Sequence, residues 1–590
     1  MSGLDETYDF VVVGSGGGSM CASLVMRCAG KSVLILEKTE LVGGTTARAG
    51  GVMWIPNNPF MRRDGVEDSS DRALAYLDAL IGDASDAPGA TPARRRSYVI
   101  EAPRMIEFLV SQGVKLTRAS YWPDYYDELP GGSVPGRTVV AELFDANELG
   151  PWKSKLRPNF LLLPGMLEDV MKLQTIKLSW KTKLLAAKIG LRAVGAKLSG
   201  RRLVTAGAAL QGRMLQAALK SGAEIRTESP VSELIVEDGA VKGVLTVKDG
   251  RPWRVGARLG VLVNAGGFSH NQALRDKYQP GTRSQWSMAI RTDQGEMIEE
   301  MMRRGAAIAQ MEEFVGNQQT IPPGAENSEL KPGAQSVTAK PHAILVDQSG
   351  VRYMNEGGSY MAYCKAMLER HKTVPAVPSW AILDSQYLDR YMLAGSMPGR
   401  DKPKRWYDEG YLHQASTIEE LAAQLKMRPE TLRATVDRFN GFVQKGKDED
   451  FGRGVRAYDR WLGDPYHKPS ATLGAITEAP FYAVPVVPGD VGTYGGVVTD
   501  EFARVLRADG SVIPGLYATG ISTASVMGRV YPGAGCSIGP SFTFGYIAAR
   551  HATGLPVGVQ SGLAAHANIA QAPAALHGSD RAARGISAPG

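Results

Sequence analysis

The sequence predicts an α/β protein that begins with a Rossmann-type dinucleotide-binding unit. A short apolar run at 8–13 leads into a glycine-rich turn, a helix-compatible apolar run to Arg27, and a second apolar run at 32–37. Two more glycine clusters, VLVNAGGF at 261–268 and GLYATG at 515–520, follow much later in the chain. Strand, glycine turn, helix and strand in this order form the βαβ unit that binds dinucleotides.

The glycine-rich turn has the residues that a pyrophosphate site requires. Gly14 permits the tight turn, Gly16 lets the backbone approach a pyrophosphate at the positive end of the next helix, and Gly18 follows in the same turn. Ser19 occupies the third position of the fingerprint, where Gly or Ala is usual, but serine is also small. Glu37 ends the second strand, where a carboxylate can hold ribose hydroxyls. We therefore expect a bound nucleotide.

Length and composition indicate a globular chain of more than one domain. It has 590 residues, of which 44% are hydrophobic and 22% charged. Its four cysteines and eight histidines have no metal-ligand spacing, so we expect neither a disulfide framework nor a metal site. No run reaches the roughly 18 apolar residues of a transmembrane helix, and the acidic N-terminus does not resemble a secretory signal. These features favour a cytoplasmic protein.

The residues after Glu37 distinguish FAD from NAD. The stretch GGTTARAGG at 43–51 adds a further glycine cluster, and the three distant clusters at 43–51, 261–268 and 515–520 suit a long, extended cofactor. Together these features resemble the FAD-binding domain of the fumarate reductase and 3-ketosteroid dehydrogenase superfamily. Covalent members carry a His beside this cluster, and none lies within 43–51, so the resemblance implies non-covalent FAD. The further cofactor contacts that it implies are Gly44, Thr45, Thr46, Gly51, Val231, Ala265, Gly266, Gly520, Ser537 and Ile538.

The same superfamily interrupts its FAD-binding domain with a catalytic domain. The resemblance implies a Rossmann-type FAD-binding domain at 1–310 and 490–555. Within it, the charge distribution indicates a basic insertion at 151–202. The resemblance also implies an inserted α+β catalytic domain at 311–489. The residues at 556–590 are rich in Ala, Gly, Pro and Ser, and we expect them to form a loose C-terminal tail.

Three tyrosine-bearing segments resemble signatures of the 3-ketosteroid Δ1-dehydrogenases. The run YPGAG at 531–535 fits a Tyr-x-Gly-x-Gly signature, and RYMNEGGSY at 352–360 fits an RYxNE-type motif with a tyrosine shortly after it. A PDY-type aromatic loop contributes one more tyrosine, for which Tyr125 matches best and Tyr126 is the next candidate. Taken alone, most of the 21 tyrosines are ordinary, partly buried aromatics, so the sequence context carries this prediction.

These residue types suit the introduction of a double bond beside a ketone. A base removes the proton at C2, the oxidised flavin N5 takes the hydride from C1, and donors hold the enolate-like oxygen. The resemblance implies Tyr360 as the base, Tyr125 as its hydrogen-bond donor, and the Tyr531 hydroxyl and Gly535 N–H as oxyanion donors. It therefore implies 1,2-dehydrogenation of 3-keto-4-ene steroids, as in steroid and sterol degradation, with an external electron acceptor.

Three alternatives stay open at the level of sequence. A 3-keto-5α-steroid 4-dehydrogenase would place the double bond between C4 and C5, and the residues hardly separate the two activities. A fumarate-type reductase clamps two carboxylates with Arg and His, whereas 521–540 contains only Arg529, no His, and several apolar residues. A non-catalytic flavoprotein bound to a membrane surface is the third alternative, and the tyrosine-bearing segments argue against it.

The net charge of +7 is concentrated in the insertion. Residues 151–202 carry twelve Lys/Arg and two Asp/Glu, a balance of +10, which argues against a nucleic-acid-binding protein. A helix at 180–198 bordered by Lys181, Lys188 and Arg192 is typical of a lipid interface, so we expect peripheral contact with the inner face of the cell membrane. Packing on the protein's own core or on a second subunit is the alternative. The apolar stripe would consist of Trp180, Leu184, Ala187, Leu191, Val194 and Leu198.

Overall fold

A computed structural model describes residues 3–558, and its largest element is a mixed sheet of eight strands. These are β1 (Glu6–Val13), β2 (Val33–Leu36), β8 (Glu224–Arg226), β9 (Glu233–Glu237), β10 (Ala240–Lys248), β11 (Arg251–Val263), β20 (Arg504–Leu506) and β21 (Val512–Ala518). The main path runs β20-β21-β11-β1-β2-β8, parallel from β21 to β8. The mixed α/β architecture is confirmed. The tail expected at 556–590 lies, from residue 559 onward, outside the described residues.

The βαβ unit expected near the N-terminus is present. Strand β1 leads through the glycine turn into α1 (Gly17–Cys28), and β2 follows, close to the positions that the sequence predicted. The last four residues of β1 and all of β2 are buried, as is typical of parallel strands covered on both faces.

Alternating residues of β1 divide between two cores because successive side chains of a strand point to opposite faces. Phe10 and Val12 lie in the larger core, which includes residues of α1, α8 (Ala206–Lys220) and α18 (Ile538–Ala552). The residues next to them lie in a second core on the other face. Helix α18 packs against α1 within the larger core. The N-terminus of α18 thereby comes close to the glycine turn.

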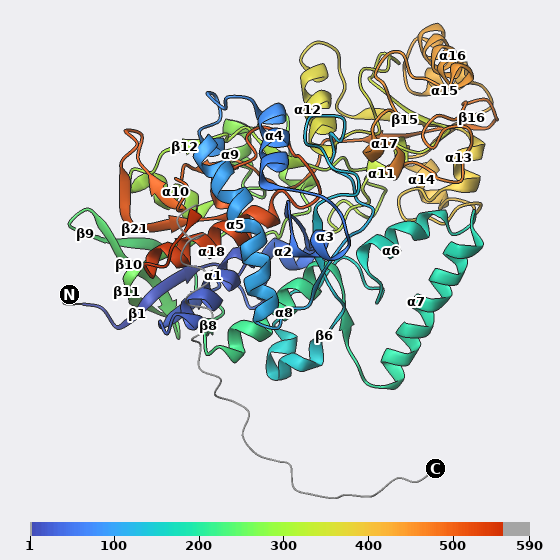
Figure 1. Ribbon diagram of the computed structural model, residues 1–590. Coiled ribbons are helices and arrows are strands. Elements are labelled where there is room, and N and C mark those ends of the chain that lie inside the picture. The colour runs from blue at the N-terminus through green and yellow to red at the C-terminus, as the bar shows by residue number, and fades with distance from the viewer. Residues whose placement is uncertain (1–2, 559–590) are drawn as a thin grey trace, which may run out of the picture.

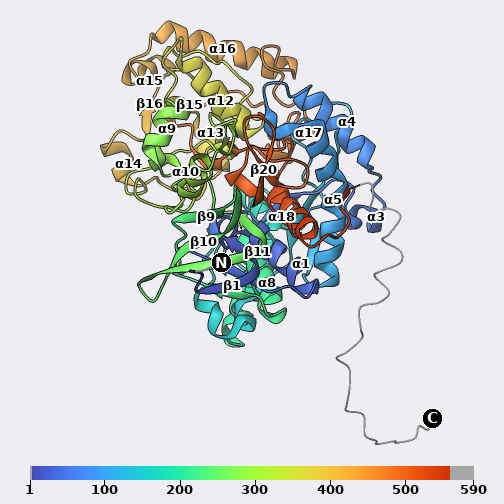
Figure 2. The same ribbon diagram turned by 90° about the vertical axis from the view of Figure 1, so that its left-hand side faces the viewer.

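A smaller antiparallel sheet has all its strands between residues 343 and 486. Its order is β14 (Ala343–Val346), β15 (Ser379–Leu383), β17 (Phe481–Val486) and β16 (His413–Ala415). Helices α15 (Ile418–Gln424) and α16 (Pro429–Lys445) pack on it through a core of their own. Figures 1 and 2 both show these elements at one end of the molecule, away from the larger sheet.

The basic segment 151–202 forms a helical layer at the periphery. Its α-helices are α6 (Leu167–Lys172) and α7 (Trp180–Leu198), so the helix that the sequence predicted is confirmed. Figure 1 shows α7 at the edge of the molecule, below the smaller sheet. The Val42 N–H donates to the Lys155 carbonyl at 2.8 Å, which ties the start of the segment to the main body. Within the described residues, no helix is long and apolar enough to cross a membrane.

Candidate active site

A cavity of about 480 Å³ lies where the glycine turns meet the carboxyl ends of the central strands. Its walls combine segments that are far apart in the sequence, among them 14–16, 44–46, 264–266 and 520–521. Twelve of the fourteen residues expected to bind the cofactor line it. They are Gly14, Gly16, Glu37, Gly44, Thr45, Thr46, Val231, Ala265, Gly266, Gly520, Ser537 and Ile538.

Gly18 and Gly51, the other two, lie outside the cavity lining. A Cβ atom on Gly18 would lie 2.3 Å from the Ser541 carbonyl oxygen, so this glycine lets α1 approach α18 closely. Gly51 has a φ of +65°, and a Cβ there would lie 2.5 Å from the carbonyl carbon of Ala206. Both glycines are required for packing between elements, a role that has the same sequence signature as a ligand contact.

The start of α1 fits the pyrophosphate of a dinucleotide. No side chain caps the N-terminal N–H groups of this helix, and its first turn carries no acidic residue. These N–H groups and the positive end of the helix dipole favour an anion. Gly16 and Asn264 both line the cavity, and a Cβ on Gly16 would lie 3.1 Å from Asn264 Nδ2, so a larger side chain there would crowd this wall of the cavity.

Glu37 fits the ribose of the same ligand. Its carboxylate accepts hydrogen bonds from the Ser15 hydroxyl and from both the N–H and the hydroxyl of Thr39, and it lines the cavity. A buried carboxylate held in this way can also accept a hydrogen bond from a ribose hydroxyl. Among the cavity-lining residues of the described chain there is no His, Cys or Tyr that could attach covalently to a flavin.

Three tyrosines expected to be catalytic meet next to this cavity. The rings of Tyr125 and Tyr360 pack edge to face with centroids 5.4 Å apart. The Tyr531 ring lies 5.2 Å from that of Tyr360 and 6.1 Å from that of Tyr125. Tyr360 begins α12 (Tyr360–His371), whereas the other two lie in loops far away in the sequence. The fold therefore brings together side chains that no single segment could supply.

Ser537 connects the tyrosines to the cavity that it lines. Its hydroxyl oxygen lies 3.0 Å from that of Tyr531. Gly535 has a φ of +98°, and a Cβ there would lie 2.4 Å from the Val52 carbonyl oxygen, so only glycine fits. The Gly535 N–H has no hydrogen-bond partner among residues 3–558. The Tyr531 hydroxyl and this N–H thus lie on one loop, which leads into the cavity lining at Ser537, and both groups can donate a hydrogen bond.

Burial controls the protonation state of the tyrosine cluster. Burial raises the pKa of Tyr125 and of Tyr360 well above 10, and charge on the neighbouring tyrosines raises each of them further. Burial also raises the pKa of Tyr531, to about 12, and hydrogen bonds with Ser537 and Tyr360 oppose this rise. All three hydroxyls are therefore protonated at neutral pH.

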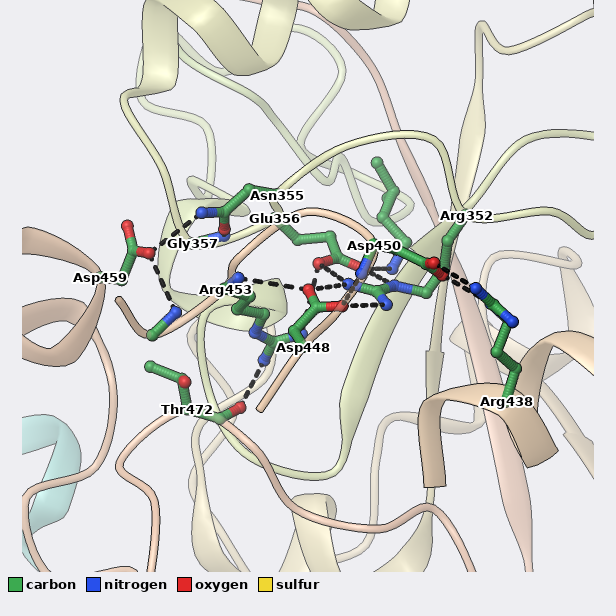
Figure 3. A network of polar contacts seen from close by, with 12 residues as sticks. Arg352, Asn355, Glu356, Gly357, Arg438, Asp448, Asp450, Arg453, Asp459 and Thr472 are labelled. Atoms are coloured by element: carbon green, nitrogen blue, oxygen red, sulfur yellow. Dashed lines mark hydrogen bonds and ion pairs between the residues drawn. The ribbon is translucent and has the colours of Figure 1, made fainter. Parts of the chain in front are cut away.

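The RYxNE-type motif before Tyr360 forms a buried ion-pair network. Arg352 donates to both carboxylate oxygens of Glu356, at 2.7 and 2.8 Å, and to Asp448 at 3.0 and 3.3 Å. Figure 3 shows these contacts together with Arg453, which bonds to backbone carbonyls from several segments. The network fixes the loop from which α12 starts, and it thereby positions Tyr360 without touching the cavity.

Two neighbouring tyrosines lie outside the cluster. The hydroxyl of Tyr353 bonds to a serine of β15 at 2.7 Å. Tyr126 faces the Arg456 guanidinium, 4.9 Å from the ring centroid. Tyr125, by contrast, is fully buried in the cluster, and its N–H donates to the Pro532 carbonyl at 2.9 Å. The geometry thus favours Tyr125 over Tyr126, and Tyr360 over Tyr353.

Tyr458 is a member of the cluster that the sequence analysis missed. It lies in α17 (Ala457–Leu462) and stacks on Tyr125 with ring centroids 4.0 Å apart. Its hydroxyl accepts a hydrogen bond from Gln335 Nε2. The surrounding sequence RAYDRWL carries no motif, so no local signal distinguishes Tyr458 from the many ordinary tyrosines.

Comparisons with known proteins agree with this geometry. A family model for an FAD binding domain matches residues 9–538. The chain is 39% identical over 561 residues to a 3-oxosteroid 1-dehydrogenase of Mycolicibacterium smegmatis, covering 92% of this chain and 97% of that protein. It is 38% identical over 563 residues to a 3-oxosteroid 1-dehydrogenase of Mycobacterium tuberculosis, covering 92% and 98%.

A solved structure extends this likeness to the whole fold. The 3-ketosteroid delta1-dehydrogenase from Sterolibacterium denitrificans, in complex with 1,4-androstadiene-3,17-dione, matches with a TM-score of 0.86 at 34% identity. The match covers 93% of this chain and 100% of that chain.

Proposed function

The chain belongs to the FAD-binding family that contains the 3-oxosteroid 1-dehydrogenases, and on this premise we propose how its residues perform their reaction. The protein is an FAD-dependent oxidoreductase that dehydrogenates 3-ketosteroids at the 1,2 position. One observation carries the assignment of roles: Tyr125, Tyr360 and Tyr531 converge at the edge of the cavity that fits FAD.

FAD would be held without a covalent bond. The turn at Gly14 and Gly16 would hold its pyrophosphate and Glu37 its ribose, and no His, Cys or Tyr lines the described cavity. When bound, FAD supplies the acceptor for the hydride that leaves C1, and an external electron acceptor must then complete the cycle. Acid precipitation should release the yellow colour into the supernatant, whereas colour kept in the pellet would contradict non-covalent binding.

Tyr360 would take the proton from C2 of the steroid. Its hydroxyl is neutral at rest because burial raises its pKa, and its hydrogen bond to Tyr125 raises the pKa further. For the deprotonated form to act as the base, the Tyr125 hydroxyl would have to turn and donate to it instead. The Tyr531 hydroxyl and the Gly535 N–H would hold the C3 oxygen as it gains negative charge. Loss of a proton from C2 and a hydride from C1 leaves the 1,2 double bond.

A fumarate-type reduction fits this site poorly. Arg529, the one arginine within 521–540, pairs with Asp86, Glu312 and Glu313, so it is not free to clamp a dicarboxylate.

A saturated 3-keto-5α-steroid tests the position of the double bond, because it can be oxidised at either place. Mass spectrometry and NMR of the product should identify the 1-ene. A 4-ene as the only product would assign the chain to the 4-dehydrogenase alternative instead.

We propose that residues 311–489 are a catalytic domain inserted into an FAD-binding domain of 1–310 and 490–555. The strands of the larger sheet lie at 6–263 and 504–518, on both sides of the smaller sheet in sequence, which supports this division. Strand β13 (Phe314–Gly316) pairs with β18 (Asp490–Thr493). The two points at which the chain would pass between the proposed domains therefore lie side by side.

We also propose that the basic segment 151–202 contacts an anionic membrane surface. The stripe on α7 does not pack on the chain's own core, since the side chains of Trp180, Leu184 and Leu191 are 77%, 70% and 74% exposed. The preceding loop adds Leu162, which is 86% exposed. The segment's balance of +10 complements anionic lipid, and each basic residue near such a surface contributes about 1 kcal/mol.

Co-sedimentation with anionic and neutral liposomes tests this contact. The protein should sediment with anionic liposomes at low salt, and Leu184→Ser/Leu191→Ser should reduce the bound fraction. Val110→Ser/Val236→Ser, which changes exposed apolar residues far from α7, is the matched control. If the protein stays in the supernatant and light scattering instead finds a dimer that the α7 variant disrupts, the stripe is a subunit interface.

A further inference from the structure

A second cavity of about 310 Å³ lies where the basic segment meets the smaller sheet. It is lined by Phe160 and Gln174 of the segment, by Met288, and by residues of 330–340 and 387–395. Phe160 and Leu330 are each 38% exposed, so the cavity has an apolar rim at the surface. Figure 1 shows α6 just below α14 (Lys404–Asp408).

Helix α11 (Gln335–Thr338) has this cavity on one side and the tyrosine cluster on the other. Val337 lines the cavity, whereas Gln335 donates to the hydroxyl of Tyr458. The Tyr458 ring in turn stacks on that of Tyr125. The cavity and the tyrosine cluster thus lie on either side of one short helix.

Two lysines make the lining of the cavity positive. Lys331 and Lys340 line it and are only 7% and 5% exposed, and no Asp or Glu is among its lining residues in the described chain. Lys340 Nζ donates to the carbonyl oxygens of Leu462 and Gly463, each at 2.7 Å, which leaves a third N–H of the ammonium group. Lys331 Nζ donates to the Ser328 carbonyl at 2.6 Å.

The surroundings of Lys340 favour an anionic partner. Burial lowers its pKa to about 8, and the charge of Asp464 opposes this shift only in part. The Asp464 carboxylate also accepts a hydrogen bond from the Tyr391 hydroxyl at 2.7 Å, and Tyr391 lines the cavity. A ligand carboxylate would stabilise the ammonium form, because buried charges need a partner in place of water.

We propose that this cavity binds the carboxylate end of an amphipathic molecule, and that 3-ketosteroids with a carboxylate-terminated side chain are the preferred substrates. The inference rests on the proposed 1,2-dehydrogenation and concerns the end of the steroid remote from ring A. A free fatty acid has the same chemistry, an apolar body with one carboxylate, and is the other source of such a ligand.

The test compares one steroid in two forms with the FAD-loaded enzyme. A 3-keto-4-ene steroid whose C17 side chain ends in a carboxylate is assayed beside its methyl ester. We expect the ester to have a KM about tenfold higher, because the ester cannot form the charged hydrogen bonds. Because each form serves as the control for the other, the ester-to-acid KM ratio is insensitive to a general loss of activity.

Two variants locate the effect. Lys340→Met should bring the ester-to-acid KM ratio close to one. If this variant does not fold because the carbonyls of Leu462 and Gly463 lose their donor, Lys331→Met provides a second measurement, since Lys331 does not bond to those carbonyls. Lys404→Met removes an exposed lysine from α14 (Lys404–Asp408) and should preserve the wild-type ratio.

A ratio near one in the wild type, with turnover of both forms, would overturn this inference and leave the proposed function intact. Absence of turnover for both forms and for a steroid with a C17 ketone would contradict the proposed function instead. Equilibrium binding of oleate distinguishes the second source. If oleate binds in a way that depends on the two lysines while the ester-to-acid KM ratio is near one, the cavity is a carboxylate site, but its assignment to the steroid side chain is overturned.

Discussion

The flavin cavity and the tyrosine cluster are built by different means. The cavity is formed largely by backbone and small side chains at strand ends, where glycines give a ligand room. The cluster is formed by large aromatic side chains from four distant segments: Tyr125, Tyr458 and Tyr531, which are buried, and Tyr360, which is partly buried. A substitution in the cavity should therefore act through cofactor binding, whereas one in the cluster should act on turnover with the cofactor in place.

The largest effect is expected from a substitution in the cavity. In Gly16→Val the added methyl groups would lie in the approach to the pyrophosphate site, beside Asn264 Nδ2, so FAD binding and all activity should be lost. The ratio of flavin to protein absorbance in the purified variant measures this. Gly441→Val is the matched control because a Cβ there meets nothing within 4 Å, and it should retain flavin.

The next largest effect is expected at Tyr360, with the flavin still bound. Tyr360→Phe removes the proposed base and should lower kcat about 10³-fold with little change in KM, since general base catalysis contributes mainly in the transition state. Steady-state kinetics on the FAD-loaded variant tests this. Tyr353→Phe, which removes a hydroxyl that bonds outside the cluster, should stay close to wild type. The opposite result for the two variants would exclude Tyr360 as the base.

A smaller loss is expected from the loop that joins the two regions. In Gly535→Ala the new Cβ would meet the Val52 carbonyl oxygen at 2.4 Å and displace the N–H that is proposed to hold the C3 oxygen. We expect kcat to fall about 10²-fold, the effect typical of one lost oxyanion donor. Flavin content should stay normal. A variant that instead loses its flavin would show that the loop serves the cavity and not the reaction.

The sequence predicts the two regions to different degrees for a physical reason. Gly14, Gly16 and Glu37 occupy fixed positions relative to two strands, so local order in the chain determines how they meet. Gly18 has the same local signature but is required for helix packing, a difference that only the tertiary structure reveals. For the tyrosines, the family resemblance supplied the candidates, and nothing local marks Tyr458.

The smallest effect is expected from pH, and it concerns only the cluster. Burial raises the pKa of Tyr360, so the fraction of deprotonated base is small at pH 7 and grows as pH rises. The log of kcat should therefore increase with a slope of about one per pH unit from neutral to mildly alkaline pH. Flavin affinity over the same range should change little. A kcat that falls as pH rises would contradict a tyrosine base.

The most direct test of the central claim is the anaerobic reduction of the bound flavin by a 3-keto-4-ene steroid deuterated at C1 or at C2. The account predicts rapid bleaching of the wild-type flavin, slowed by deuterium at either position, because a proton leaves C2 and a hydride leaves C1. In Tyr360→Phe, bleaching should be about 10³-fold slower. Bleaching of this variant at the wild-type rate, with an unchanged isotope effect at C2, would show that another group takes the proton.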